Sequence, residues 1–167
     1  MNAKTKKLVL TALLAALTCV ATLVIKIPSP LKGYLNLGDC VVLAAGWMLS
    51  PAYGFAAAGL GSALADLFAG YVVYAPATFL IKGGMALIAC YGFRWLRPAT
   101  GALPARVISG AVAESGMVLG YFLFEGMLYG FGPSLVNIPA NAVQGVAGLI
   151  LGTVLIKFVE KSKLPLE

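Results

Sequence analysis

The sequence contains no histidine and only three cysteines, and both shortages narrow the chemistry that the protein can perform. Histidine is the commonest metal ligand and the commonest general base, so most hydrolytic and metal-dependent mechanisms lose their usual residues. Cys19, Cys40 and Cys90 stand singly in apolar runs, without the CxxC spacing of a zinc or redox site. We therefore expect no catalytic activity, no metal site and no cofactor, and we expect the cysteines to be small buried residues.

Charge is also scarce. Charged residues make up 11% of the 167 residues, whereas about a quarter of an ordinary soluble domain is charged. Hydrophobic residues make up 60%, and the mean hydropathy is +0.94. A soluble chain of this length would need a larger polar surface. The composition therefore predicts an integral membrane protein, and the 20 glycines agree, since glycine is more frequent in membrane helices than in soluble ones.

The apolar runs predict an all-α, polytopic membrane protein in which residues 1–167 form a single domain of six transmembrane helices. The boundary between the second and third helices is indicated by Ser50 and Pro51, a capping hydroxyl followed by proline at the first helical position. The predicted helices cover residues 8–27, 35–49, 51–70, 74–95, 105–127 and 135–157.

The distribution of basic residues predicts the orientation. With both termini in the cytoplasm, six spans place nine basic residues inside and two, Lys26 and Lys32, outside. A five-span alternative, with residues 40–65 as one helix, would place the arginines of the 94–106 region outside. The excess of basic residues on the cytoplasmic side would then be lost. The net charge of +6 is therefore attributed to orientation and contact with anionic lipid, not to nucleic acid. The nine inside residues are Lys4, Lys6, Lys7, Arg94, Arg97, Arg106, Lys157, Lys161 and Lys163.

Polar side chains recur at helical spacing on three consecutive predicted helices. Tyr74, Thr78 and Lys82 occupy every fourth position, so they share one face. The second and third stripes are formed by Glu114, Tyr121 and Glu125, and by Asn137, Asn141 and Gln144. Ionisable groups inside a membrane mark a functional cavity by default. The predicted ligand-binding residues are Asn36, Asp66, Tyr74, Thr78, Lys82, Glu114, Tyr121, Asn137, Asn141 and Gln144.

Structural explanations of the same residues stay open. Polar side chains also hold membrane helices together. Lys82 could be the internal ion-pair partner of Asp66 or of Glu114, with no ligand involved. Small residues at fourfold spacing, such as Ala12 and Ala16 in the first predicted helix, are typical of close helix packing.

The chain resembles the substrate-binding S components of energy-coupling factor (ECF) vitamin transporters, in the subfamily of riboflavin-type and related carriers. The resemblance covers nearly the whole chain. It rests on the six-span size, on the basic N-terminus followed by "TALLAALTCVATLV", on "GYLNLGD" at 33–39, and on "GSALADLFAGYVVYAPATFLIKG" at 61–83.

This resemblance implies a six-helix fold that binds a vitamin near the extracellular side, with the loop "KIPSPLKGYLN" (26–36) as a lid. It implies docking on a transmembrane coupling subunit through helix one, where Ala12 and Ala16 match the family's AxxxA pattern. It also implies two separate ATPase subunits, because this chain has no GxxxxGK[ST] motif. We expect the protein in the cytoplasmic membrane of a bacterium or archaeon.

The ligand is predicted from the polar stripes, which suit a small hydroxylated aromatic ring of the pyridoxine (vitamin B6) or hydroxymethylpyrimidine type. Riboflavin is the alternative, because the subfamily resemblance points to it. Two hypotheses of other classes remain: a stand-alone proton-coupled carrier that uses Asp66 and Glu114, and a structural membrane subunit whose polar residues only join helices.

Overall fold

The computed structural model describes residues 2–28 and 34–161, and this part of the chain is almost entirely helical. A pair of two-residue strands, β1 and β2, interrupts the helices after α1, and a 3-10 turn, η1, precedes α7. In chain order the elements are α1 (Ala3–Val24), β1 (Ile27–Pro28), β2 (Tyr34–Leu35), α2 (Gly38–Met48), α3 (Pro51–Phe68), α4 (Ala75–Thr100), α5 (Ala102–Tyr129), α6 (Phe131–Ser134), η1 (Leu135–Asn137) and α7 (Ile138–Lys161).

Each of the six predicted helices corresponds to one helix of the structure, with ends that differ from the predicted ones by up to five residues. The connection predicted at "LRPATGALPAR" is helical on both sides of Gly101, because Pro98 is tolerated in the last turn of α4. Gly101 reverses the chain with φ +82°, a left-handed conformation that glycine adopts without steric penalty. Pro51 begins α3 after Ser50, as predicted, but the prediction of a capping hydroxyl is wrong, because the Ser50 side chain makes no capping hydrogen bond.

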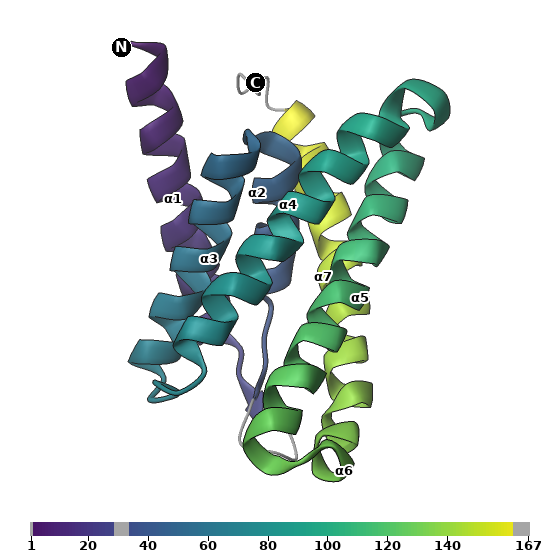
Figure 1. Cartoon of the computed structure of the whole chain (residues 1–167). Helices are drawn as coiled ribbons and strands as arrows, with labels where there is room; N and C mark the ends of the chain where they lie inside the picture. Colours follow the sequence, from purple (N-terminus) through teal and green to yellow (C-terminus); the bar gives the residue numbers. More distant parts are fainter. Residues whose placement is uncertain (1, 29–33, 162–167) are drawn as a thin grey trace.

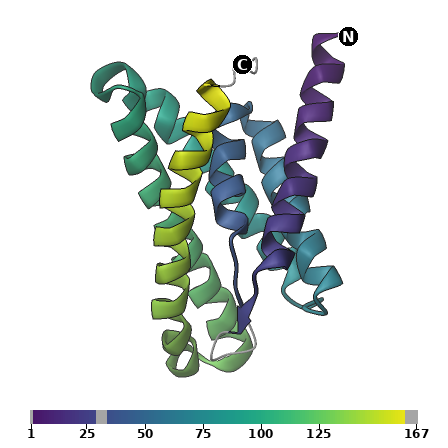
Figure 2. The ribbon, with the colours of Figure 1, turned by 180° about the vertical axis from the view of Figure 1, so that it is seen from behind.

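The helices form one bundle in which α2 is central (Figures 1 and 2). Successive long helices run in alternating directions, so α1 begins and α7 ends at the same end of the bundle. Helix α2 packs against α1, α3, α4 and α7, and ten of its 11 residues are buried. This helix therefore contributes its whole surface to the core and offers almost none to a surrounding lipid phase.

By length and composition, four helical stretches of the described chain are able to cross a membrane: Lys4–Val24, Ala75–Thr100, Ala102–Tyr129 and Phe131–Lys161. Helix α2 is apolar but has only 11 residues, which at about 1.5 Å per residue is roughly half of a bilayer core. The prediction of an all-α membrane protein is thus supported, whereas six full spans stay a prediction.

The β1–β2 pair brings the connection between α1 and α2 to the end of the bundle that lies away from both chain ends (Figure 2). The strands are antiparallel, with Ile27 opposite Leu35 and Pro28 opposite Tyr34. Residues 29–33 of the predicted lid at 26–36 lie outside the described residues. The C-terminal part of that segment, from Tyr34 to Asn36, contributes side chains to the pocket described below.

Helices α2 and α4 approach closely at Gly46. A β-carbon at this position would lie 2.6 Å from the backbone oxygen of Ala86, which cannot move aside without shifting α4. Small residues permit such approaches in membrane bundles, where helix association depends on van der Waals packing.

We predict that Gly46→Ala lowers stability by about 1–3 kcal/mol, because over-packing displaces backbone. The measurement is the midpoint of thermal unfolding in detergent. The matched control is Gly84→Ala on α4, since a β-carbon there meets nothing within 4 Å. Equal midpoints for the two variants would contradict the packing argument.

Candidate ligand-binding site

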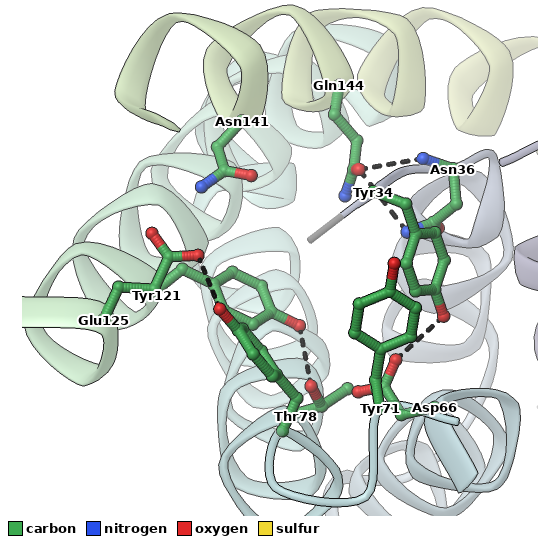
Figure 3. Close-up of a pocket in the computed structure, with 10 residues that line it drawn as sticks. Tyr34, Asn36, Asp66, Tyr71, Thr78, Tyr121, Glu125, Asn141 and Gln144 are labelled. Atoms are coloured by element: carbon green, nitrogen blue, oxygen red, sulfur yellow. Dashed lines mark hydrogen bonds between the residues drawn. The ribbon is translucent and has the colours of Figure 1, made fainter. Parts of the chain in front are cut away.

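A polar cavity lies at the end of the bundle where α3 meets α4 and where α5 leads into α7 (Figure 3). Its volume is about 40 Å³, room for roughly three water molecules. Helices α3, α4, α5 and α7 all contribute to it, together with β2 and the residue that follows it. The lining residues are Tyr34, Asn36, Asp66, Tyr71, Tyr74, Thr78, Tyr121, Glu125, Asn141 and Gln144.

One wall joins a carboxylate to two tyrosines whose rings pack at a tilt of 52°. The hydroxyl of Tyr34 donates to Asp66 Oδ1 at 2.8 Å, and the Tyr34 ring packs on Tyr71 with centroids 5.0 Å apart. Burial, followed by the nearby charge of Asp66, raises the pKa of Tyr34, so that its hydroxyl keeps its proton and acts as the donor. The second oxygen of Asp66 has no hydrogen-bond partner, although the residue is only 6% exposed.

The opposite wall is held by hydrogen bonds between helices. Thr78 of α4 and Tyr121 of α5 lie 3.0 Å apart through their hydroxyls. Glu125 of α5 accepts a bond from the Tyr74 hydroxyl at 3.5 Å and two from the Asn137 amide at 3.0 Å. These contacts satisfy Glu125 and fix the spacing of α4, α5 and the start of α7.

Gln144 of α7 joins the pocket to the centre of the bundle. Its Oε1 accepts from the backbone N–H of Asn36 at 2.9 Å, and its Nε2 donates to Asp39 Oδ2 at 2.7 Å. The Asn36 side chain in turn accepts from the backbone N–H of Gly38 at 2.9 Å, at the start of α2. Gln144 thus ties the segment between β2 and α2 to α7.

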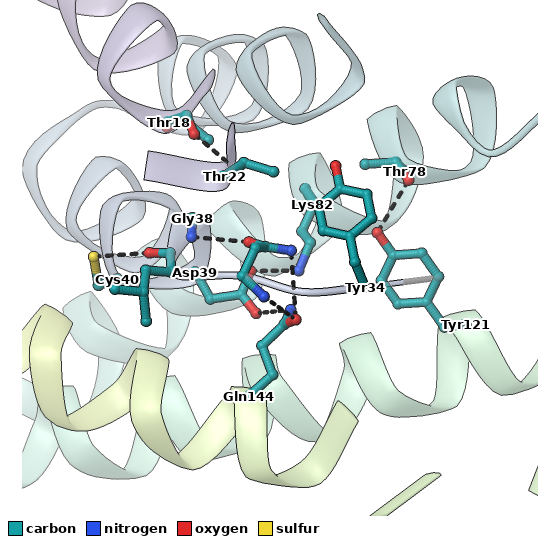
Figure 4. Close-up of polar contacts among 12 residues, drawn as sticks. Thr18, Thr22, Tyr34, Gly38, Asp39, Cys40, Thr78, Lys82, Tyr121 and Gln144 are labelled. Atoms are coloured by element: carbon teal, nitrogen blue, oxygen red, sulfur yellow. Dashed lines mark hydrogen bonds and ion pairs between the residues drawn. The ribbon is translucent and has the colours of Figure 1, made fainter. Parts of the chain in front are cut away.

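Behind the pocket, Lys82 forms a buried ion pair with Asp39 (Figure 4). The exposed fractions of the two side chains are 3% and 0%. The Lys82 ammonium also lies 5.5 Å from the centre of the Tyr121 ring, within the range of a cation–π contact. The sequence alone suggests Asp66 or Glu114 as the ion-pair partner of Lys82. That expectation is corrected, because Asp39 at the start of α2 is nearer than either.

The structure brings seven of the ten predicted binding residues to the cavity and leaves three behind its wall. Asn137 is occupied by Glu125, and Lys82 by Asp39. Glu114 lies deeper, in a groove between α5 and α7 beside Gly145, and its two buried oxygens have no hydrogen-bond partner. The seven that line the cavity are Asn36, Asp66, Tyr74, Thr78, Tyr121, Asn141 and Gln144.

Four residues of this region were absent from the predicted binding set: Tyr34, Asp39, Tyr71 and Glu125. Glu125 shares the helical stripe of Tyr121, so the spacing signal was present. Tyr34 and Tyr71 belong to connections, where helical periodicity gives no information about direction. Asp39 follows the segment "GYLNLG", and only its position opposite Lys82 shows its role.

Ala12 and Ala16 lie on the outer side of α1, and both are exposed. The inner side of this helix is buried through Thr11, Leu14 and Thr18. The two small side chains therefore lie on an exposed face of α1.

Three comparisons agree with this architecture. Residues 2–161 match the family profile described as "ECF-type riboflavin transporter, S component". An "uncharacterized protein in gap 3′ region" of Pyrococcus woesei is 36% identical over 134 residues, which cover 80% of this chain and 87% of that protein. The "thiamine precursor transporter HmpT" of Lactococcus lactis subsp. cremoris (strain MG1363) is 29% identical over 164 residues, covering 96% and 92% respectively.

Among solved structures, the chain is similar to one described as "Structure and mechanism of the S component of a bacterial ECF transporter". The TM-score is 0.75 with 22% identity, and the match covers 95% of this chain and 97% of the other. This likeness supports the fold. Together with the family match across nearly the whole sequence, it leads to one conclusion: the chain belongs to the family of ECF-type riboflavin transporter S components, which are membrane proteins of vitamin uptake.

Proposed function

We propose that this protein is the high-affinity substrate-binding S component of an ECF importer for a small pyrimidine of the hydroxymethylpyrimidine type. The observation that carries the proposal is the cavity itself, which is small, polar and walled by four tyrosines, Tyr34, Tyr71, Tyr74 and Tyr121. Aromatic rings and a few placed polar groups are the usual means of holding a planar ligand. The similarity to a thiamine precursor transporter supports the same class of ligand.

The size of the cavity favours a single ring over a flavin. At about 40 Å³, the space must widen even for a pyrimidine, and a three-ring isoalloxazine would require a much larger displacement. The half-buried Tyr34 and Tyr71 lie outside the long helices, so they can move without separating α4 from α5. Pyridoxine has a similar size, and riboflavin is the larger alternative. Both therefore serve as comparison ligands.

The polar groups suit a ligand with donors and acceptors on opposite edges. Asp66 presents a free carboxylate oxygen on one side. Figure 3 shows Asn141 turned into the same space from α7, with no hydrogen bond to the other labelled residues. An amide both donates and accepts, so it can pair with a hydroxymethyl group or a ring nitrogen.

In this proposal the protein has six spans, with both termini in the cytoplasm and the cavity facing outward. The alternating helices and the basic residues near the α4–α5 connection support that orientation. The exposed strip of Ala12 and Ala16 receives a transmembrane coupling subunit. Two separate ATPase subunits supply the energy for transport.

We predict that the purified chain alone binds 4-amino-5-hydroxymethyl-2-methylpyrimidine more tightly than pyridoxine or riboflavin, without ATP. At a concentration 100 times its Kd, a ligand stabilises the folded state by about 2.7 kcal/mol, which a thermal-shift assay in detergent detects. Isothermal titration gives the affinities. Tighter binding of riboflavin or pyridoxine would reject this ligand class.

The same preparation tests the stand-alone carrier hypothesis. We expect proteoliposomes that contain this chain alone to show no pyrimidine uptake after a pH step, because they do not contain the separate coupling and ATPase subunits. Uptake driven by the pH step would instead favour a proton-coupled carrier.

A further inference from the structure

The second carboxylate oxygen of Asp66 is an unused acceptor in the wall of the cavity. Asp66 is 6% exposed, and its Oδ1 accepts the Tyr34 hydroxyl at 2.8 Å, whereas Oδ2 has no partner. A buried carboxylate oxygen without a donor is costly, and removing it from water without compensation destabilises the protein. A ligand donor would restore the missing hydrogen bond.

Two other groups face the same space: the neutral amide of Asn141, and the hydroxyl of Thr78, which lies beside the Asp66 carboxylate and 3.0 Å from the Tyr121 hydroxyl. The remaining polar groups are engaged elsewhere. Both oxygens of Glu125 accept from the Asn137 amide. Gln144 uses its oxygen for Asn36 and its nitrogen for Asp39. The described residues that line the cavity include no lysine or arginine, and Lys82 forms its ion pair with Asp39. Asp66 therefore presents an acceptor that no cation of the lining neutralises.

The position of Asp66 relative to the aromatic wall determines what kind of donor fits. Tyr34, whose hydroxyl holds Oδ1, packs on Tyr71 with ring centroids 5.0 Å apart. The Tyr34 hydroxyl lies in the plane of its own ring, so a planar ligand ring that packs parallel to Tyr34 also presents its edge to the carboxylate. The donor must therefore be an N–H or O–H in the plane of the ligand ring.

We propose that Asp66 is a specificity-determining residue, whose Oδ2 accepts a hydrogen bond from the exocyclic amino group of a heteroaromatic ligand. This inference rests on the proposed function and assigns the chemical feature that the site selects. An aminopyrimidine satisfies the acceptor, whereas an analogue without the amino group leaves the buried oxygen unpaired. A hydrogen bond to a charged group has a large discriminating effect when its absence leaves the protein partner unsatisfied.

The test compares two ligands and three proteins by isothermal titration. The ligands are 4-amino-5-hydroxymethyl-2-methylpyrimidine and its analogue with hydrogen in place of the amino group. The proteins are the unmodified chain, Asp66→Asn and Glu125→Gln. Glu125→Gln is the matched control, because Glu125 also lines the cavity but its oxygens are already occupied.

The unmodified protein is expected to prefer the amino compound by about 10- to 100-fold. In Asp66→Asn the amide oxygen remains with Tyr34 and the amide N–H faces the ligand donor, so the preference should fall below about threefold. Glu125→Gln should weaken both ligands and keep their ratio. An unchanged ratio in Asp66→Asn, or an equal loss of ratio in Glu125→Gln, overturns the assignment.

Two outcomes separate this inference from the proposed function. If the unmodified protein binds the amino compound without preferring it over the analogue, the role of Asp66 is rejected while the proposed function stands. This comparison needs no mutant, so it decides the matter even if Asp66→Asn fails to fold. If the unmodified protein binds neither compound, the pyrimidine function itself is rejected, and the role of Asp66 falls with it.

Discussion

Replacing Lys82 by methionine is expected to destabilise the protein by about 3–5 kcal/mol, the usual effect of breaking one side of a buried ion pair. Methionine keeps the length and the apolar stem of lysine, so the change removes mainly the charge. Asp39 would then be a carboxylate with 0% exposure, and the Gln144 amide would be its remaining hydrogen-bond donor. The measurement is unfolding of the purified protein during an SDS titration in mixed micelles.

A double variant tests the physical reason. Lys82→Met combined with Asp39→Asn removes both charges of the ion pair, and the asparagine oxygen can still accept from Gln144. We expect the double variant to be more stable than Lys82→Met alone, because the uncompensated carboxylate has gone. If the second substitution lowers stability further, by the amount it causes in the unmodified protein, the two residues are not coupled and the ion pair is not the cause.

Placing tryptophan at Ala12 is expected to abolish vitamin uptake by cells that contain a complete ECF transporter, and to leave ligand binding by the isolated chain unchanged. Ala12 is exposed on α1, on the side away from the bundle, so a large side chain does not disturb the fold. A partner helix that approaches small residues at this face would be held away by an indole ring. Uptake of labelled ligand and its affinity for the purified variant are the two readouts.

The control for this experiment is tryptophan at Val112, which is 54% exposed on α5. This substitution adds similar bulk to a different outward face and should preserve both uptake and binding. Loss of binding in the Ala12 variant would contradict the interface role, and so would normal uptake. Equal loss of uptake in both variants would indicate a general effect of surface tryptophans, not a docking face on α1.

Much of the fold was predictable because helix boundaries depend on local chemistry. Apolar length predicted the helices, and Ser50 with Pro51 predicted the division between α2 and α3. The same local signals predicted a non-helical connection between α4 and α5 that is too long. Helix α4 continues through Pro98 to Thr100, and within this connection only Gly101 adopts a positive φ.

The binding residues were predictable where helical spacing applies. Thr78, Tyr121 and Asn141 were expected from stripes on three successive helices, and the structure brings all three to one cavity. Tyr34 was not expected as a lining residue, and Tyr71 only as a ring available for stacking, because residues in connections have no periodicity from which a direction can be inferred. Their part in the aromatic wall depends on where the β1–β2 pair and the α3–α4 turn come to lie.

By itself, the sequence determined that this chain is a helical membrane protein with buried charges and with a face of small residues on its first helix. Those properties follow from composition and from spacing along single helices.

Only the tertiary structure decided which charged side chains contact each other. Asp39 pairs with Lys82, 43 residues away in the sequence, because α2 lies at the centre of the bundle against α4 and α7. Asp66, which the sequence suggested as the ion-pair partner of Lys82, instead accepts a hydrogen bond from the Tyr34 hydroxyl. Its other carboxylate oxygen has no hydrogen-bond partner at the cavity. Such partnerships depend on the packing of distant segments, which no local pattern encodes.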